Sequence, residues 1–163
     1  MILLQSYDIV FALALVIFFV SAAFFIVPFF ITPSGGQAPL PVTSITVGPT
    51  VYEVEIANSI LSRTRGLSGR PQLMTGAGML FIFPVASVYG FWMKDMRFPI
   101  DIVWISNNRV VGISHDVPPA GTDSFDLPRY YPPQPVSVVL ELPAGTAVRD
   151  GIVVDTPVSI GAY

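Results

Sequence analysis

The chain has 163 residues, of which 52% are hydrophobic and only 12% are charged, with a formal net charge of −3 and no cysteine. This length allows one domain of ordinary size and a short additional element. The hydrophobic share is too high for an ordinary soluble domain, so we expect one segment to hold the apolar excess. The lack of cysteine excludes disulfides, thiolate nucleophiles and cysteine-ligated metal sites.

The apolar excess lies near the N-terminus. No charged residue occurs between Asp8 and Glu53, and Ile9–Ile31 is almost wholly aliphatic or phenylalanine. Because a helix of about 20 apolar residues crosses a bilayer core, we predict a transmembrane helix at 9–31 after a short tail at 1–8. A cleaved signal peptide is the alternative, but its apolar region is usually shorter and follows basic residues, which the tail lacks.

The predicted helix also determines where we expect the rest of the chain. The positive-inside rule does not decide the orientation, because the first basic residue is Arg63. A short N-terminus before one helix and a folded C-terminal region most simply places that region outside the cytoplasm. Residues 32–43 are uncharged and rich in proline and glycine, so we predict a flexible spacer between membrane and domain.

The predicted domain, residues 44–163, contains eight basic and ten acidic residues, a net charge of −2. Without a clustered basic face, nucleic acid is not an expected partner. The domain contains many short β-prone runs bounded by turn residues. These runs are Ser44–Val47, Val51–Ile56, Gly78–Phe83, Gly90–Met93, Ile100–Ser106, Arg109–Ser114, Val136–Leu142, Gly151–Val154 and Ser159–Tyr163. Asn107-Asn108 fits a two-residue hairpin turn.

One helix is predicted within the domain. Asn58 or Ser59 would cap it, Gly66 would end it after Arg65, and Ile60 with Leu61 would face the core. The expected fold is therefore mainly β (α+β), a compact barrel-like or sandwich domain of about seven or eight short strands with one short helix, behind a single N-terminal transmembrane helix. Pro118–Pro135 is predicted to be a long irregular surface loop.

Five motifs follow one another through the domain. They are Arg63-Thr64-Arg65-Gly66-Leu67, Gly78-Met79-Leu80-Phe81, Phe91-Trp92-Met93-Lys94-Asp95-Met96, Pro99-Ile100-Asp101-Ile102 and Leu140-Glu141-Leu142-Pro143-Ala144-Gly145. Their order and spacing resemble the DUF192 family over Val51–Val158. The chain departs from that family at Ser68, where Met is usual, and at Val154, where Gly is usual. The resemblance implies a small β-rich domain, often behind a signal or anchor segment in bacteria and archaea, and no established activity.

The densest group of polar side chains among aromatic residues surrounds Trp92. On a strand at 90–93, Trp92 and Lys94 would share a face. A Trp platform with charged neighbours suits a sugar, a glycan or a peptide, and the candidate binding residues are Trp92, Lys94, Asp95, Arg97 and Arg63. In the alternative interpretation, Trp92 and Trp104 are core residues and the charged residues form a turn.

Asp101 and Glu141 are the weak candidates for catalytic residues. As a carboxylate pair they could cleave a glycosidic bond by acid and base catalysis. The alternative is structural, with both acids acting as ion-pair or capping partners of Arg63 and Arg65.

Metal and cofactor sites are not expected. His115 and Asp116 are adjacent, so on a strand they would point to opposite faces. With one histidine and no cysteine, a zinc site lacks ligands. Asp123 and Asp126 lack the regular spacing of a calcium loop.

Two functions of different classes remain open. The preferred one is a membrane-anchored module that binds an envelope glycan, peptide or protein through the Trp92 region and the Pro118–Pro135 loop. The alternative is a hydrolase of a cell-envelope polymer that uses Asp101 and Glu141. The enzyme requires both carboxylates in one cleft, at least one with a displaced pKa, whereas the module requires only an exposed aromatic patch.

Overall fold

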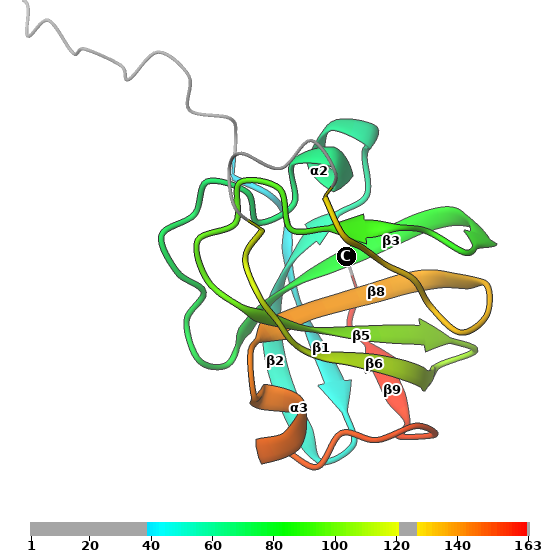
Figure 1. Ribbon diagram of the computed structural model, residues 1–163. Helices are drawn as coiled ribbons and strands as arrows, with labels where there is room; N and C mark the ends of the chain where they lie inside the picture. The colour runs from blue at the N-terminus through cyan, green and yellow to red at the C-terminus, as the bar shows by residue number, and fades with distance from the viewer. Residues whose placement is uncertain (1–38, 121–126, 163) are drawn as a thin grey trace, which may run out of the picture. The chain divides into compact units, whose positions relative to one another are not determined.

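The computed structural model describes residues 39–120 and 127–162. The predicted tail at 1–8 and transmembrane helix at Ile9–Ile31 lie outside these ranges, as does most of the predicted spacer. No helix within the described ranges is long and apolar enough to cross a membrane. The described residues form a β-rich domain with two short helices, as Figure 1 shows.

Seven strands form one curled sheet with the order β6-β5-β8-β3-β2-β1-β9 (Figure 1). The parallel pairing of β2 with β3 is the exception among otherwise antiparallel neighbours, and it requires a crossover, which contains α2. The first strand begins inside the predicted spacer. In chain order the strands are β1 (Val42–Val47), β2 (Thr50–Ala57), β3 (Ala77–Ser87), β5 (Ile100–Ser106), β6 (Arg109–Val117), β8 (Val136–Pro143) and β9 (Val158–Ile160).

The two outer strands approach each other at one end of the sheet. Val110 N donates to Thr156 O (3.0 Å), and Asp155 N donates to Val110 O (2.8 Å). Val158 N donates to Asn108 O (2.8 Å). These bonds connect the start of β6 to the segment that enters β9, so the sheet is a curled half-barrel. Of the two predicted architectures, the barrel-like one is confirmed.

A second, two-stranded sheet consists of β4 (Phe91–Trp92) and β7 (Arg129–Tyr130). Trp92 pairs with Arg129 in its antiparallel register. The strand β7 lies within Pro118–Pro135, which the sequence predicts to be irregular throughout. Part of this segment is therefore ordered by backbone pairing with β4.

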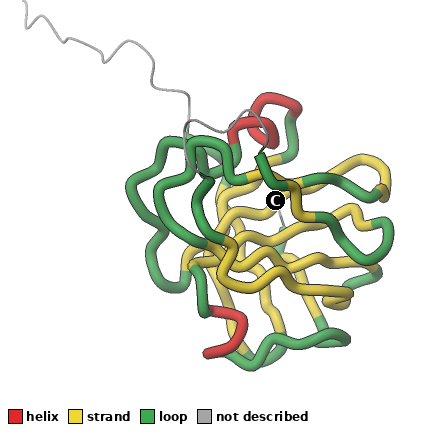
Figure 2. The backbone as a smooth tube through the Cα atoms, in the orientation of Figure 1, coloured by secondary structure: helices red, strands yellow, loops and turns green. Residues whose placement is uncertain are grey.

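The helices α2 (Ile60–Arg65) and α3 (Thr146–Arg149) lie at opposite ends of the sheet, as Figure 2 shows. The boundaries of α2 are as predicted, because Ser59 caps its first turn and Gly66 ends it with a φ of 51°. Its predicted inward face is wrong. Ile60 and Leu61 are 76% and 73% exposed, and the buried residue of α2 is Ser62, which exchanges hydrogen bonds with Ser59.

The region after β8 differs from the prediction. The sequence predicts a strand at Gly151–Val154, but these residues form an irregular segment with turns after α3, an unpredicted helix. The physical reason is backbone direction, because Gly145 and Gly151 have φ values of 76° and 66° and reverse the chain on both sides of α3. Val154 is consequently exposed despite its β propensity.

The hairpin between β5 and β6 is confirmed. Asn107 and Asn108 have φ values of 49° and 57°, which are the left-handed conformations of a two-residue type I′ turn. Ser106 pairs with Arg109 directly across that turn.

The sheet has an apolar cluster on each face. Leu140 and Leu142 belong to one cluster, and Val139 belongs to the other. Since side chains alternate along a strand, Glu141 shares the face of Val139. That face is the one against which Phe91 packs, so a carboxyl is inserted into an apolar surface.

Candidate functional site

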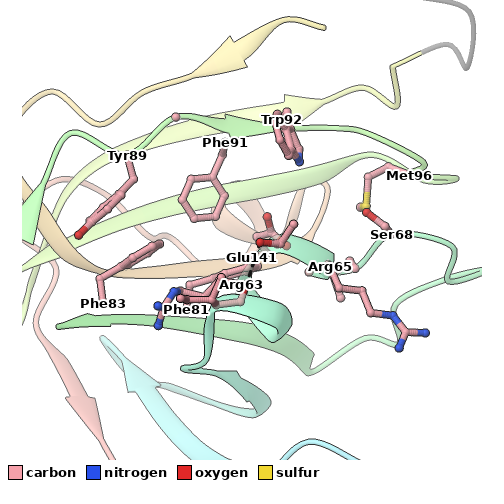
Figure 3. A pocket seen from close by; sticks show the side chains of 15 residues that line it. Arg63, Arg65, Ser68, Phe81, Phe83, Tyr89, Phe91, Trp92, Met96 and Glu141 are labelled. Carbon is pink, nitrogen blue, oxygen red and sulfur yellow. Dashed lines mark hydrogen bonds between the residues drawn. The ribbon is translucent and has the colours of Figure 1, made fainter. Parts of the chain in front are cut away.

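A pocket of about 280 Å³ lies on the Glu141 face of the sheet, next to α2 (Figure 3). In Figure 3, Glu141 lies between α2 on one side and Phe91 with Trp92 on the other. Arg63 and Arg65 of α2 also line the pocket. Its aromatic residues come from β3, from β4 and from the segment between them. They are Phe81, Phe83, Tyr89, Phe91 and Trp92.

The aromatic side chains hold one another in place. Phe83 stacks on Tyr89 with ring centroids 3.8 Å apart. Phe91 makes edge contacts with Phe81 at 5.0 Å and with Trp104 at 5.3 Å. Such pairs add about 0.5–1.5 kcal/mol beyond burial. The wall of the pocket is therefore formed before any ligand arrives.

The two tryptophans have different environments. Trp104 is 1% exposed, and its Nε1 donates to Ser114 Oγ at 3.2 Å. Trp92 is 38% exposed, and the guanidinium of Arg129 lies 4.7 Å from its ring centroid. The interpretation of both as core residues is right for Trp104 only, because Trp92 stands at the rim of the pocket.

Arg63 attaches α2 to the aromatic wall. Its Nη1 donates to Asn58 O (2.5 Å) and to Ile82 O (2.8 Å). Its guanidinium carbon lies 5.1 Å from the centroid of Phe83, within the range of a cation–π contact. These contacts fix the guanidinium at the wall. The side chain of Arg65 extends away from Glu141 in Figure 3.

Glu141 contributes a buried carboxyl to the pocket. It is 6% exposed, and no hydrogen bond from the residues at 39–120 or 127–162 reaches its side-chain oxygens. Burial raises the pKa of Glu141 to about 8, against the opposing charge of Arg70. The physical cause is desolvation, which penalises the ionised form. At neutral pH the carboxyl is therefore mostly protonated.

Arg70 is the cation whose charge acts on Glu141, and it is bound to another acid. Its Nη1 and Nη2 donate to Glu55 at 2.5 and 2.6 Å, and these bonds hold the pKa of Glu55 below its usual range. Glu55 pairs with Met79, which pairs with Glu141 across β8. Glu55, Met79 and Glu141 thus form one row across the sheet. The guanidinium of Arg70 is paired with Glu55 and donates no hydrogen bond to Glu141.

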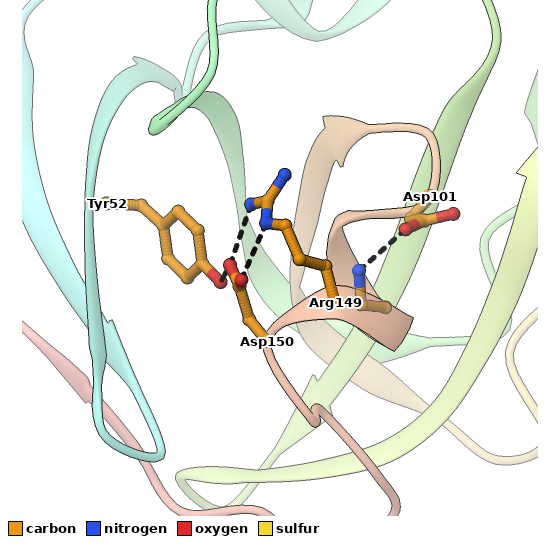
Figure 4. A network of polar contacts seen from close by, with 5 residues as sticks. Tyr52, Asp101, Arg149 and Asp150 are labelled. Carbon is orange, nitrogen blue, oxygen red and sulfur yellow. Dashed lines mark hydrogen bonds and ion pairs between the residues drawn. The ribbon is translucent and has the colours of Figure 1, made fainter.

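Asp101 and Glu141 do not share a cleft. Across β5 and β8, Asp101 pairs with Leu142, while Glu141 pairs with Ile102, so the two carboxyls point to opposite faces of the sheet. Asp101 is fully buried and accepts hydrogen bonds from Asp116 N (2.9 Å) and Ala147 N (2.8 Å). The second bond appears in Figure 4. The arginine partner predicted for Asp101 is wrong, because backbone amides satisfy its carboxylate.

A polar network fixes the end of α3, as Figure 4 shows. Tyr52 Oη donates to Asp150 Oδ2 at 2.5 Å, and Arg149 Nε donates to Asp150 Oδ1 at 2.8 Å. Burial and then the bond to Asp150 raise the pKa of Tyr52, whereas the bond to Arg149 lowers that of Asp150. Among the described residues, no hydrogen bond joins this network to a residue that lines the pocket, so we interpret it as structural.

Among the predicted binding residues, Trp92 and Arg63 line the pocket, whereas Lys94, Asp95 and Arg97 do not. These three are exposed in the turn after β4. Hydrogen bonds to its carbonyl oxygens fix that turn, with Ser68 Oγ donating to Lys94 O at 2.7 Å and Gly69 N donating to Asp95 O at 2.9 Å. His115 is also exposed, and the described part of the chain contains no group of three metal-ligating side chains.

The aromatic wall is the part of the site that the sequence prediction missed. A signal for it exists, because Phe81 and Phe83 are two residues apart, as are Tyr89 and Phe91. Such spacing on a strand places Phe81 and Phe83 on one face of β3, whereas Tyr89 precedes β4. The convergence of the two pairs depends on the turn between them, which sequence spacing does not specify.

Known proteins resemble the domain in sequence and in fold. The DUF192 family model, described as uncharacterized ACR, matches residues 43–160. A crystal structure of a protein of unknown function from Novosphingobium aromaticivorans has a TM-score of 0.68 at 27% identity, covering 78% of this chain and 89% of that chain. The structure of a "putative transcription regulator" from Sinorhizobium meliloti has a TM-score of 0.67 at 26% identity, covering 77% and 98%. No curated protein matches the chain.

Proposed function

Because this chain belongs to the DUF192 family of uncharacterised proteins, we propose its function from its pocket, as a membrane-anchored module that binds an envelope glycan, peptide or protein. The observation that carries this proposal is a preformed aromatic pocket with a buried carboxyl that lacks a hydrogen-bond partner among the described residues. Ligand sites are typically apolar concavities with a few polar groups. The site comprises Trp92 at the rim, Arg63 at the wall and Glu141 inside.

The anchor and the location are part of the same proposal. They rest on the uncharged, apolar run Ile9–Ile31, which is long enough to span a bilayer. A domain that follows one such helix would act outside the cytoplasm, within reach of envelope polymers. The pocket residues all lie in the described domain and do not depend on the anchor.

Two other functions have less support. A hydrolase with an Asp101 and Glu141 pair is disfavoured, because these carboxyls face opposite sides of the sheet. The description of the Sinorhizobium meliloti protein as a "putative transcription regulator" concerns that protein. We do not extend it to this chain, because its domain has a net charge of −2 and thus lacks the electrostatic character of a nucleic-acid binder.

A binding screen of the full chain tests the proposal. Envelope glycan fragments and peptides are titrated while tryptophan fluorescence is recorded, and binders are then measured by calorimetry. We expect a saturable ligand whose affinity falls about tenfold in Trp92→Ala, since loss of an aromatic side chain that anchors a ligand costs at least about 1 kcal/mol.

Lys94→Ala is the matched control, because this exposed neighbour does not line the pocket. Its affinity should equal that of the unmodified chain, and both variants should keep the unfolding midpoint. The proposal fails if no member of the screen binds, or if both variants lose affinity equally.

A further inference from the structure

Glu141 presents an unusual polar group to the pocket. Among the described residues, Arg63 and Arg65 of α2 line the pocket, and Arg70, which is paired with Glu55 of β2, is the cation whose charge acts on Glu141. Arg70 is paired with Glu55, and no described group donates a hydrogen bond to Glu141. A buried carboxyl without donors retains its proton. It therefore offers the ligand one O–H donor and one carbonyl acceptor.

The aromatic faces disfavour a cationic ligand. Arg129 lies over Trp92 at 4.7 Å, and Arg63 lies over Phe83 at 5.1 Å. A second cation near these rings would meet like charges at short range. It would also require ionisation of a carboxyl that is kept neutral by burial.

An anionic ligand would find few hydrogen-bond donors from the described residues at the base of the pocket. A desolvated anion requires several hydrogen bonds from charged or backbone groups. Both N–H groups of Arg63 Nη1 already donate to carbonyl oxygens, and the guanidinium lies over Phe83 in the wall, not at the base. Arg65 extends away from Glu141 (Figure 3). The O–H of Glu141 alone would not stabilise a full negative charge there.

An uncharged sugar matches both parts of the pocket. Its C–H face packs on an aromatic ring, and its hydroxyl groups both donate and accept hydrogen bonds. The volume of about 280 Å³ lies just below the range of typical ligand sites, which measure roughly 300–1,000 Å³. Such a volume suits one ring better than a long peptide segment.

We infer that the pocket binds an uncharged glycan residue, which stacks on Trp92 and accepts a hydrogen bond from the Glu141 carboxyl. This inference rests on the proposed binding function and specifies its ligand class.

Three probes that share a sugar ring and differ in charge test the inference. They are methyl N-acetylglucosaminide, its deacetylated amine and methyl glucuronide, each titrated into the full chain by calorimetry. We expect the neutral probe to bind about tenfold more tightly than either charged one. Its affinity should fall about tenfold between pH 7 and pH 9, because the pKa of Glu141 is about 8 and only the protonated fraction is competent.

Glu141 variants separate donation of a hydrogen bond from a structural role. Glu141→Gln keeps an N–H donor, so it should bind the neutral probe within a few-fold and lose the pH dependence. Glu141→Met keeps the approximate volume without a donor and should lose about tenfold in affinity. Glu53→Gln, on the exposed side of β2, should behave as the unmodified chain.

The failures of the two proposals differ. The inferred ligand class is wrong, although the pocket binds a ligand, if the amine binds more tightly than the neutral probe and its affinity increases with pH, or if the glucuronide binds more tightly than the neutral probe. The ligand class is also wrong if a peptide from the screen binds and none of the three probes does. If neither the probes nor the screen yields a ligand, both proposals fail.

Discussion

Two buried acids of this domain, Asp101 and Glu141, differ by one position in the pairing of β5 with β8 and therefore lie on opposite faces of the sheet. Asp101 and Glu141 lie on adjacent strands, but two backbone N–H groups reach Asp101, whereas no described donor reaches Glu141. The first carboxyl connects β5 to α3 and to the backbone of β6. The carboxyl of Glu141 faces the pocket, where its burial is energetically unfavourable unless it stays neutral or binds a ligand.

Protonation of Glu141 should make the stability of the protein depend on pH. Its folded pKa of about 8 lies above its ordinary value of 4.5, so the folded state holds a proton that the unfolded state lacks between these values. The contribution of this protonated carboxyl to the free energy of unfolding is complete below about pH 4.5 and is lost as the pH rises through 8. We expect the free energy of unfolding to fall by up to about 1.4 kcal/mol per pH unit in this window, measured by urea denaturation.

Glu141→Gln should flatten that slope, because its side chain does not titrate. Glu53→Gln is the control and should retain the slope of the unmodified chain. Equal slopes for the unmodified chain and Glu141→Gln would mean that Glu141 is ionised in the folded protein at neutral pH.

Among the elements, α2 is small but forms one wall of the pocket. Its six residues make too few helical bonds to be stable alone. The side chains of Ser59 and Ser62 each accept a hydrogen bond from the backbone N–H of the other, which caps the first turn. Arg63 donates hydrogen bonds from the helix to the carbonyl oxygens of Asn58 and Ile82. Capping and tertiary contacts, rather than an apolar helix face, therefore hold α2 in place.

Removal of the cap should destabilise the domain. Ser59→Ala leaves the N–H of Ser62 without its side-chain acceptor, at an expected cost of about 1 kcal/mol in urea unfolding. Ser59→Asp keeps an acceptor at the cap and should remain within about 0.5 kcal/mol of the unmodified chain. If the two variants unfold at the same urea concentration, the cap does not stabilise α2.

At the scale of the whole molecule, the proposed binding belongs to the compact domain, and the proposed location depends on the segment before it. The full chain should remain in the membrane fraction of its host cells after an alkaline carbonate wash, because an uncharged run of this length partitions into the bilayer. A chain that begins at Pro39 should move to the soluble fraction. Release of the full chain by the wash, or a mature chain whose mass lacks the segment, would contradict an uncleaved anchor.

Local chemistry in the sequence was sufficient to predict most elements. Short β-prone runs between turn residues marked most strands, the Asn pair marked the hairpin, and Ser59 with Gly66 bounded α2. These signals act over a few residues, so they need no knowledge of distant partners. The strand prediction for the apolar run Gly151–Val154 was wrong for the same reason. The β propensity of these residues does not reveal that Gly145 and Gly151 adopt positive φ angles and reverse the chain around α3.

The sequence by itself determined the family, the β-rich class and two of the pocket residues, Trp92 and Arg63, because these follow from motifs and residue types. Only the tertiary structure decided that Trp92 is at the rim while Trp104 is buried. It also placed Glu141 beside the aromatic wall and Asp101 on the opposite face. The reason is that strand order and register bring together residues far apart in the chain, and a shift of one residue exchanges the two faces of a sheet.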